Sequence, residues 1–251
     1  MLDPFFERRK QTAGVGYFLT DPQQESGWLA RFSIHDLRNN PVKYYVKNVP
    51  VELQSAVLAG FDDWNANLEG VLGHELLSYE ILQKGDPRYE QIVAGDPRFN
   101  VLDWDIENLA SYGGLGPAIS NTITGQHLAA HVYIQGPTIL QIYRAWFKVK
   151  DESERLLASN QPQAATQLKR NFVRQMVERS KRENTGRQSR IRLGSLAFRI
   201  PALDPHLRDT LAVDPLDFLQ IPEGYTYETY MNGYWREIVA HELGHNLGLS
   251  R

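Results

Sequence analysis

The strongest constraint on this chain is a pair of histidines, His241 and His245, four residues apart in a segment of helical periodicity. A helix is predicted over residues 226–247, and it places both imidazoles on nearly the same face, about 6 Å apart along the axis. Two imidazole nitrogens can then converge on one metal at the ~2.0–2.1 Å distance that zinc requires. The spacing therefore predicts a zinc-binding helix with His241 and His245 as metal ligands.

Glu242 follows the first histidine and is rotated from it by about 100° around the helix. That direction does not suit a third ligand, but it lets the carboxylate reach a water bound to the metal. Zinc lowers the pKa of a bound water towards ~7, and a neighbouring carboxylate can take its proton as the water attacks a peptide carbonyl. We therefore predict that Glu242 is a catalytic general base.

Other readings of the motif exist, because a histidine on an apolar helix is usually a packed or surface residue and short motifs arise by chance. Gly248 adds context, since it stands three residues after His245. Glycine can adopt the left-handed conformation that ends a helix and turns the chain back. This combination favours the metal site over the structural alternative.

Composition narrows the set of possible metal ligands and reaction types, because none of the 251 residues is cysteine. Disulfides, thiolate catalysis and cysteine-ligated zinc are excluded, so a zinc site must use His, Asp or Glu. The net charge of −3 gives no indication of nucleic-acid binding. No apolar run is long enough to predict a membrane span. The first ten residues lack the apolar core of a signal peptide, so any export signal is expected outside this chain.

The order of predicted elements is a strand, a helix, several strands and then helices, which indicates an α/β (α+β) domain with a mixed sheet. Strands are expected over residues 14–19, 42–46, 79–82, 99–104, 118–120 and 127–134, the last two as a pair. Helices are expected over residues 52–68, 139–150 and 152–182, with a break near 160–162. The glycine-rich segment 111–117 is predicted to be a loop and residues 201–223 a linker or ordered loop. His127 and His131, about 13 Å apart on a strand, are expected at the surface or in a cleft.

Residues 241–249 resemble the metzincin signature H-E-x-x-H-x-x-G-x-x-H. The chain is also similar to large bacterial zinc-dependent metalloproteases that have a metzincin-like domain. The segments that carry this wider resemblance are 15–18, 41–46, 60–65, 99–104, 116–118 and 124–134.

The resemblance implies a metzincin-like N-terminal subdomain, in which a mixed twisted sheet with an antiparallel edge strand packs on helices that include the active-site helix. Residues 127–134 would form that edge strand and the upper rim of a cleft, where an extended peptide could pair with free backbone groups. Residues 1–40 would be an N-terminal extension, and residues 41–251 the catalytic domain without its C-terminal subdomain. A periplasmic or secreted location is also implied by the resemblance.

The departure from the family pattern lies at Arg251, which stands where the third histidine is expected and cannot ligate zinc. A truncated or altered end, with a third ligand downstream, is the simplest account; a Glu or Asp ligand from elsewhere is the alternative. The expected function is a Zn²⁺-dependent endopeptidase acting on protein or peptide substrates, with weak activity from two ligands alone. An impaired or truncated peptide-binding module of the same fold is the second reading. A zinc aminopeptidase with a later Glu ligand is a third, which Gly248 disfavours.

Overall fold

The computed structural model describes residues 3–4, 6–10, 16–20, 27–33, 37, 40–106, 114–185 and 225–250. These residues form two compact units. A sheet unit comprises Met1–Ile106, Gly114–Ile134 and Asn232–Arg251, and a helical unit comprises Glu107–Gly113 and Gln135–Met231. The predicted linker over 201–223 and Arg251 lie outside the described residues, as do Gly14 and Val15 of the first predicted strand. The expected boundary between an extension and a catalytic domain at residue 41 stays a prediction.

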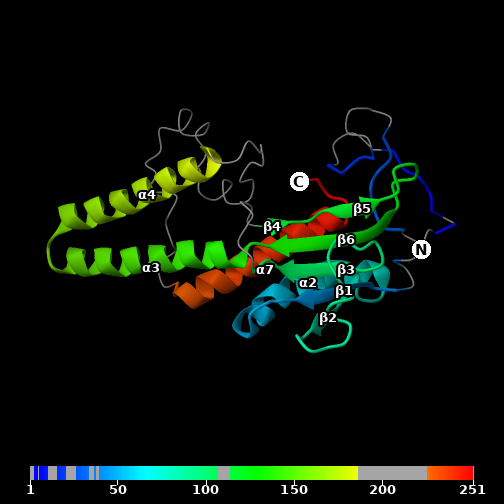
Figure 1. Ribbon diagram of the computed structural model, residues 1–251, viewed down its shortest axis with the longest axis horizontal. Helices are drawn as coiled ribbons and strands as arrows, with labels where there is room; N and C mark the ends of the chain where they lie inside the picture. Colours follow the sequence, from blue (N-terminus) through cyan, green and yellow to red (C-terminus); the bar gives the residue numbers. More distant parts are fainter. Residues whose placement is uncertain are drawn as a thin grey trace. The chain divides into compact units, whose positions relative to one another are not determined.

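The sheet unit is built on a mixed sheet (Figure 1). Its strands are β1 (Val42–Lys47), β2 (Leu77–Leu82), β3 (Asn100–Trp104), β4 (Gly114–Leu115), β5 (Ala118–Ser120) and β6 (His127–Ile134). The order across the sheet is β2-β1-β3-β6-β4, and β5 also pairs with β6. Strands β2, β1, β3 and β6 are parallel, whereas β4 and β5 run antiparallel to β6. The prediction of a mixed α/β structure with an antiparallel edge is confirmed at this level.

The assignment of residues 127–134 to the sheet edge is wrong. Strand β6 pairs in parallel with β3 on one side, with Leu102 opposite Val132, and its other side is covered by β4 and β5. The physical reason is that β6 is buried along nearly its whole length, which is typical of an interior strand with both faces covered. The antiparallel edge is formed instead by β4 and β5. The glycine-rich segment predicted to be a loop therefore contains a short strand, Gly114–Leu115.

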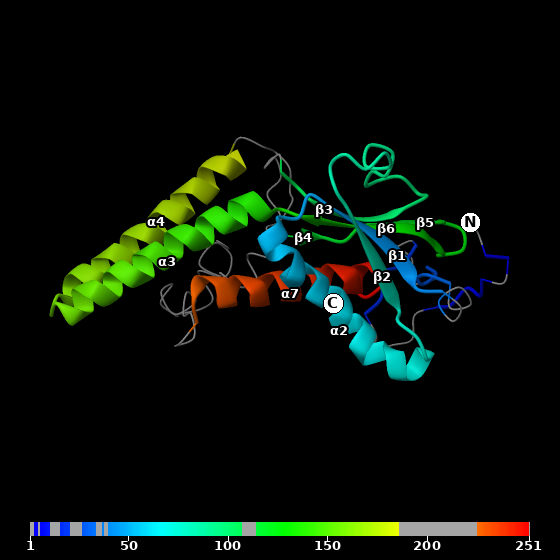
Figure 2. The same ribbon diagram turned by 90° about the horizontal axis from the view of Figure 1, so that it is seen from below.

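Two helices pack on one side of the sheet (Figure 2). Helix α2 (Val51–Leu72) connects the parallel strands β1 and β2, as a parallel pair requires. The other is α7 (Tyr227–Asn246), which belongs to the sheet unit from Asn232 onward. The helices approach closely because α2 has a glycine at position 60, where a Cβ atom would lie 2.8 Å from a methyl group of Val239. The Trp64 indole N–H donates a 2.8 Å hydrogen bond to the Ala240 carbonyl, which ties α2 to the turn before His241.

Aromatic side chains fill the space between these helices and the sheet. Tyr44 of β1 contacts Phe61 of α2, with ring centroids 5.5 Å apart, and Trp104 of β3 contacts Trp235 of α7 at 4.7 Å. All four side chains are almost completely buried. Burial of a side chain of this size contributes about 1.5–3 kcal/mol. The middle of α7 is therefore held against the sheet.

The opposite face of the sheet is covered by the connection between β2 and β3. Because side chains alternate along a strand, Tyr45 and Lys47 point away from the face that holds Tyr44. Tyr45 packs on Phe99 at a ring distance of 5.8 Å. The buried Lys47 ammonium donates hydrogen bonds of 2.7 Å to the carbonyls of Tyr89 and Ile92 in this connection. Both faces of the central strands are thus closed.

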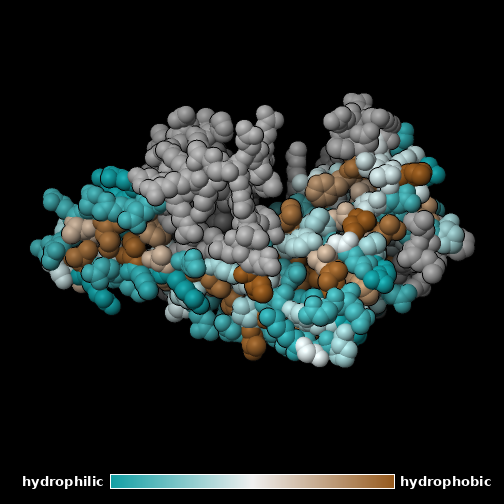
Figure 3. Space-filling view, viewed as in Figure 1, coloured by the Kyte–Doolittle hydropathy of each residue, from teal (hydrophilic) through white to brown (hydrophobic). Residues whose placement is uncertain are grey.

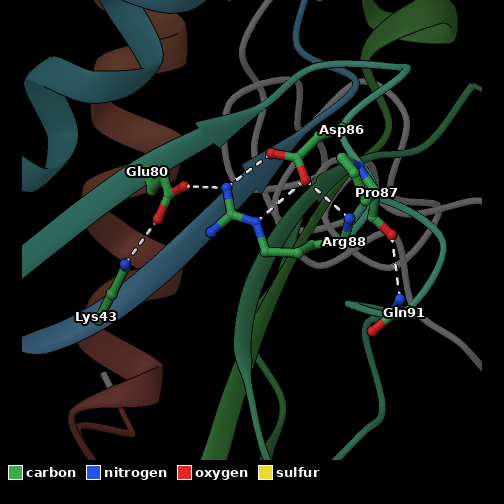
Figure 4. A network of polar contacts seen from close by, with 6 residues as sticks. All are labelled: Lys43, Glu80, Asp86, Pro87, Arg88 and Gln91. Carbon is green, nitrogen blue, oxygen red and sulfur yellow. Dashed lines mark hydrogen bonds and ion pairs between the residues drawn. The ribbon is translucent and has the colours of Figure 1, made fainter.

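A network of charged side chains lies on the surface beside β1 and β2 (Figure 4). Glu80 accepts from Lys43 at 2.7 Å and from Arg88 at 2.5 Å, and Arg88 also pairs with Asp86 at 2.7 Å. Hydrogen bonds from Arg88 and then Lys43 hold the pKa of the Glu80 carboxyl below its usual value. Because these groups are solvated, the network contributes little to stability, but it joins both strands to the turn that follows them.

The helical unit contains a pair of helices that run side by side, α3 (Gly136–Ala158) and α4 (Pro162–Thr185) (Figure 1). Their contact includes Trp146 and Phe172, with ring centroids 5.3 Å apart. The predicted break is confirmed, and Asn160 adopts a left-handed conformation there, with φ of 59°. Hydrophilic side chains cover much of the visible described surface (Figure 3). None of the described helices combines the length and apolar character that a membrane span needs.

Candidate metal centre

The two predicted ligands lie side by side near the end of α7. The ring centroids of His241 and His245 are 4.5 Å apart, with an angle of 79° between the ring planes. His241 is exposed and His245 is half-buried. Although the residue is exposed as a whole, partial desolvation of its imidazole, and then the nearby His245, lower the pKa of His241, which favours the neutral imidazole that metal binding requires. One turn of helix is therefore enough to bring both rings to one place.

The helix ends in the way its glycine predicts. Gly248 has a φ of 101°, in the left-handed region, and its N–H donates to the His245 carbonyl. Glycine is required there for a second reason, because a Cβ atom would lie 2.4 Å from the Ala30 carbonyl oxygen. The chain then turns back, so that the Leu249 carbonyl lies 2.8 Å from Nδ1 of His245.

This contact decides the tautomer of His245. A carbonyl oxygen can only accept a hydrogen bond, so Nδ1 of the neutral ring carries the proton and Nε2 keeps its lone pair. Metal-binding histidines usually donate their second ring N–H to a carbonyl or carboxylate in this manner. The donor chemistry of His245 therefore fits zinc. Within the described part of the chain, no group of three or more His, Cys, Asp or Glu side chains is placed to hold a metal ion.

Glu242 lies under the sheet edge and is only 3% exposed. Burial raises the pKa of its carboxyl to about 7, although the Gly116 N–H donates to the carboxylate and opposes this change. The main chain at residues 114 and 116 passes very close to Glu242. A Cβ atom at position 114 would lie 2.7 Å from Glu242 Oε1, and one at position 116 would lie 2.4 Å from the Glu242 main-chain oxygen. Strand β4 and the residues after it therefore need glycine to pass over the predicted base.

The sequence pattern predicts only a loop at Gly114 and Gly116 and does not reveal their contact with Glu242. A usable signal was present, because glycine at alternate positions of an extended segment marks a face where another group approaches closely. The sequence does not predict that the group approaching these glycines is Glu242, because Glu242 lies more than a hundred residues further along the chain.

Contacts to β1 and α2 hold the motif in place. The Asn246 amide donates a 3.1 Å hydrogen bond to the Tyr44 hydroxyl, and both residues are completely buried. Gly244 lets Trp64 approach, because a Cβ atom there would meet the indole ring at 3.2 Å. The buried Leu243 faces the core. The two histidines and Glu242 are thus presented by a rigid support, as a preorganised site needs.

The expectation that His127 and His131 lie at the surface or in a cleft is wrong, because both are buried in the interior strand β6. Nδ1 of His127 lies 2.7 Å from the Ser120 hydroxyl, and Nε2 of His131 accepts from the Gly95 N–H at 3.2 Å. Burial, with a smaller contribution from the charge of Arg31, lowers the pKa of His127 to about 4. His127 is therefore neutral in the folded protein near pH 7.

The buried His127 is expected to make stability fall in mild acid. Its folded-state pKa of about 4 lies below the unfolded value of about 6.5, so the unfolded chain binds the proton first as the pH falls. The contribution of neutral His127 to the free energy of unfolding is fully present above pH 6.5. It is lost progressively as the pH falls to about 4, and the total loss is about 3 kcal/mol. Urea unfolding at several pH values measures it. The wild type should lose more stability between pH 7 and 5 than His127→Gln; equal losses would contradict the prediction.

Comparisons with known proteins leave the site to be interpreted from its own residues. No family model matches the chain, and neither the curated proteins nor the solved structures gave a match.

Proposed function

We propose that this chain carries the active-site helix of a zinc-dependent endopeptidase within a metzincin-like N-terminal subdomain. One observation supports this most strongly. Two imidazole rings with centroids 4.5 Å apart adjoin a glutamate that is not paired with a cation in the described part of the chain. A chance pair of helical histidines does not require the neighbouring carboxylate to be buried. A general base beside a metal site does require a carboxylate that is shielded and held in one position.

In the proposed reaction His241 and His245 would hold zinc through their ring nitrogens, and His245 has Nε2 available for this because its Nδ1 is engaged by the Leu249 carbonyl. When bound, zinc supplies a Lewis acid that acidifies water and stabilises the developing oxyanion. Glu242 takes a proton from the water that attacks the peptide carbonyl and delivers it to the leaving amine nitrogen. The Gly116 N–H orients the carboxylate for this transfer.

A peptide substrate fits the antiparallel edge better than a compact small molecule does. Among the described residues, strand β4 is the last strand of the sheet on this side, and it lies directly over Glu242. Its Leu115 side chain is 47% exposed. An extended segment that pairs with the edge by strand addition would pass beside the proposed base. Main-chain pairing of this type selects flexible segments within a chain, which favours an endopeptidase.

The second candidate is a peptide-binding module that keeps the edge and the histidines but does not hydrolyse. It is favoured by one observation, that no third protein ligand is grouped with His241 and His245 among the described residues. Two imidazoles alone hold zinc weakly and leave its remaining positions to solvent. The two candidates share the fold and differ in turnover.

Zinc titration combined with casein hydrolysis tests the proposal. The wild type should bind one zinc ion per chain, and hydrolysis should disappear on chelation and return when zinc is restored. His241→Ala should weaken zinc binding at least tenfold, whereas His74→Ala, a histidine outside the motif, should not. Equal zinc affinity in the wild type and His241→Ala would overturn the proposal. Zinc binding without hydrolysis would favour the second candidate.

A further inference from the structure

We propose that residues 16–20, here called the strap, form a positioning element for His245 and determine which of its ring nitrogens is free for the metal. The inference rests on the proposed function for the use of that nitrogen. How the His245 ring is held depends only on contacts within the chain, and not on the proposed function.

The strap pairs with the residues that follow the zinc helix. Tyr17 and Leu249 form an antiparallel bridge. The Phe18 N–H donates to the Gly248 carbonyl at 2.9 Å, and the Ser250 N–H donates to the Gly16 carbonyl at 3.0 Å. These two hydrogen bonds lie on either side of Leu249. The turn after α7 is thus held by a segment more than two hundred residues away in the sequence.

One peptide plane links the strap to His245. The Leu249 carbonyl and the Ser250 N–H belong to the same trans peptide group, so they point in opposite directions. The N–H side is bonded to Gly16 in the strap, and the carbonyl side accepts from Nδ1 of His245 at 2.8 Å. Fixing the N–H therefore fixes the direction of the carbonyl. The hydrogen bonds of the helix end do not do this, because they hold the N–H groups of Gly248 and Leu249 instead.

The strap is itself tied to the sheet. The Phe18 carbonyl accepts from the Ala30 N–H at 2.8 Å, and the Thr20 N–H donates to Trp28 at 2.9 Å. Arg31 then continues this pairing to the turn before β6, where its N–H donates to the Gly125 carbonyl at 3.0 Å. The Phe18 ring also packs on the His245 ring, with centroids 5.4 Å apart. The imidazole is therefore held at Nδ1 and contacted by the tilted Phe18 ring.

The tautomer of His245 is the direct readout, because it requires neither zinc nor activity. Nitrogen-15 NMR of the metal-free chain should show the His245 proton on Nδ1. Ser250→Pro removes the N–H that bonds to Gly16, and the proton should shift towards Nε2. Ser250→Ala keeps that N–H and should keep the wild-type tautomer. Phe18→Pro breaks the pairing from the strap side. Phe18→Ala keeps that N–H and removes only the ring that packs on His245, so it is the matched control and should keep the wild-type tautomer.

Zinc affinity supplies the second readout. Loss of the hydrogen bond behind a metal-binding histidine typically weakens affinity about 10- to 100-fold, so Ser250→Pro and Phe18→Pro should show that loss in chelator competition. A proton on Nε2 in the wild type would overturn the inference, and so would proline variants with unchanged tautomer and affinity. If one proline variant does not fold, the other supplies the same comparison, because each removes one of the two hydrogen bonds between the strap and residues 248–250. A proton on Nδ1 in a chain that binds no zinc would support the positioning and overturn the proposed function.

Discussion

Glu242→Gln is expected to lower the rate of peptide hydrolysis by about 10²- to 10⁴-fold, the usual contribution of a positioned general base. The amide has nearly the shape of the carboxyl, and its oxygen can still accept from the Gly116 N–H. Folding and zinc affinity should therefore change little, because neither depends on a proton at this position. The measurement is kcat/KM on a fluorogenic peptide, with zinc affinity determined in parallel.

A matched control is available on the same helix. Glu228→Gln makes the same chemical change at an exposed position in the first turn of α7 and should leave hydrolysis unchanged. If Glu242→Gln and Glu228→Gln hydrolyse peptide equally well, Glu242 is not the base. If Glu242→Gln instead loses its affinity for zinc, the Glu242 carboxylate is a metal ligand and not the general base.

Gly116→Ala is expected to produce the second largest effect. The added Cβ atom would lie 2.4 Å from the Glu242 main-chain oxygen and 3.1 Å from Cβ of His245. Neither atom is at the end of a flexible side chain, so the edge segment and α7 must move apart. Overpacking of this kind typically costs about 1–3 kcal/mol. Hydrolysis should also fall, because the N–H of residue 116 is drawn away from the carboxylate.

Urea denaturation and peptide hydrolysis, measured on the same preparations, test this expectation. Gly233→Ala is the control, since it lies in α7 and a Cβ atom there meets nothing within 4 Å. Replacing that helical glycine should stabilise the chain by about 0.5–1 kcal/mol, as alanine is the better helix former. A Gly116→Ala variant as stable and as active as Gly233→Ala would show that the close contact with Glu242 is not required.

Individual helices and strands, and the end of the zinc-binding helix, could be predicted from the sequence. The helix around His241 and His245 follows from apolar residues at helical spacing, and its end follows from Gly248. Strands β1, β3 and β6 follow from runs of apolar and β-branched residues. In each case the signal lies within a single element, because side-chain periodicity reflects the face that the element buries.

Only the tertiary structure decided what lies beside the motif. It placed β6 inside the sheet, put Gly116 on Glu242 and connected Gly16 through Ser250 to the ring of His245. These contacts join segments far apart in the chain, and they depend on main-chain N–H and carbonyl groups that every residue type other than proline supplies. Residue identity therefore determined which atoms can bind a metal, whereas the folded backbone determined how those atoms are oriented.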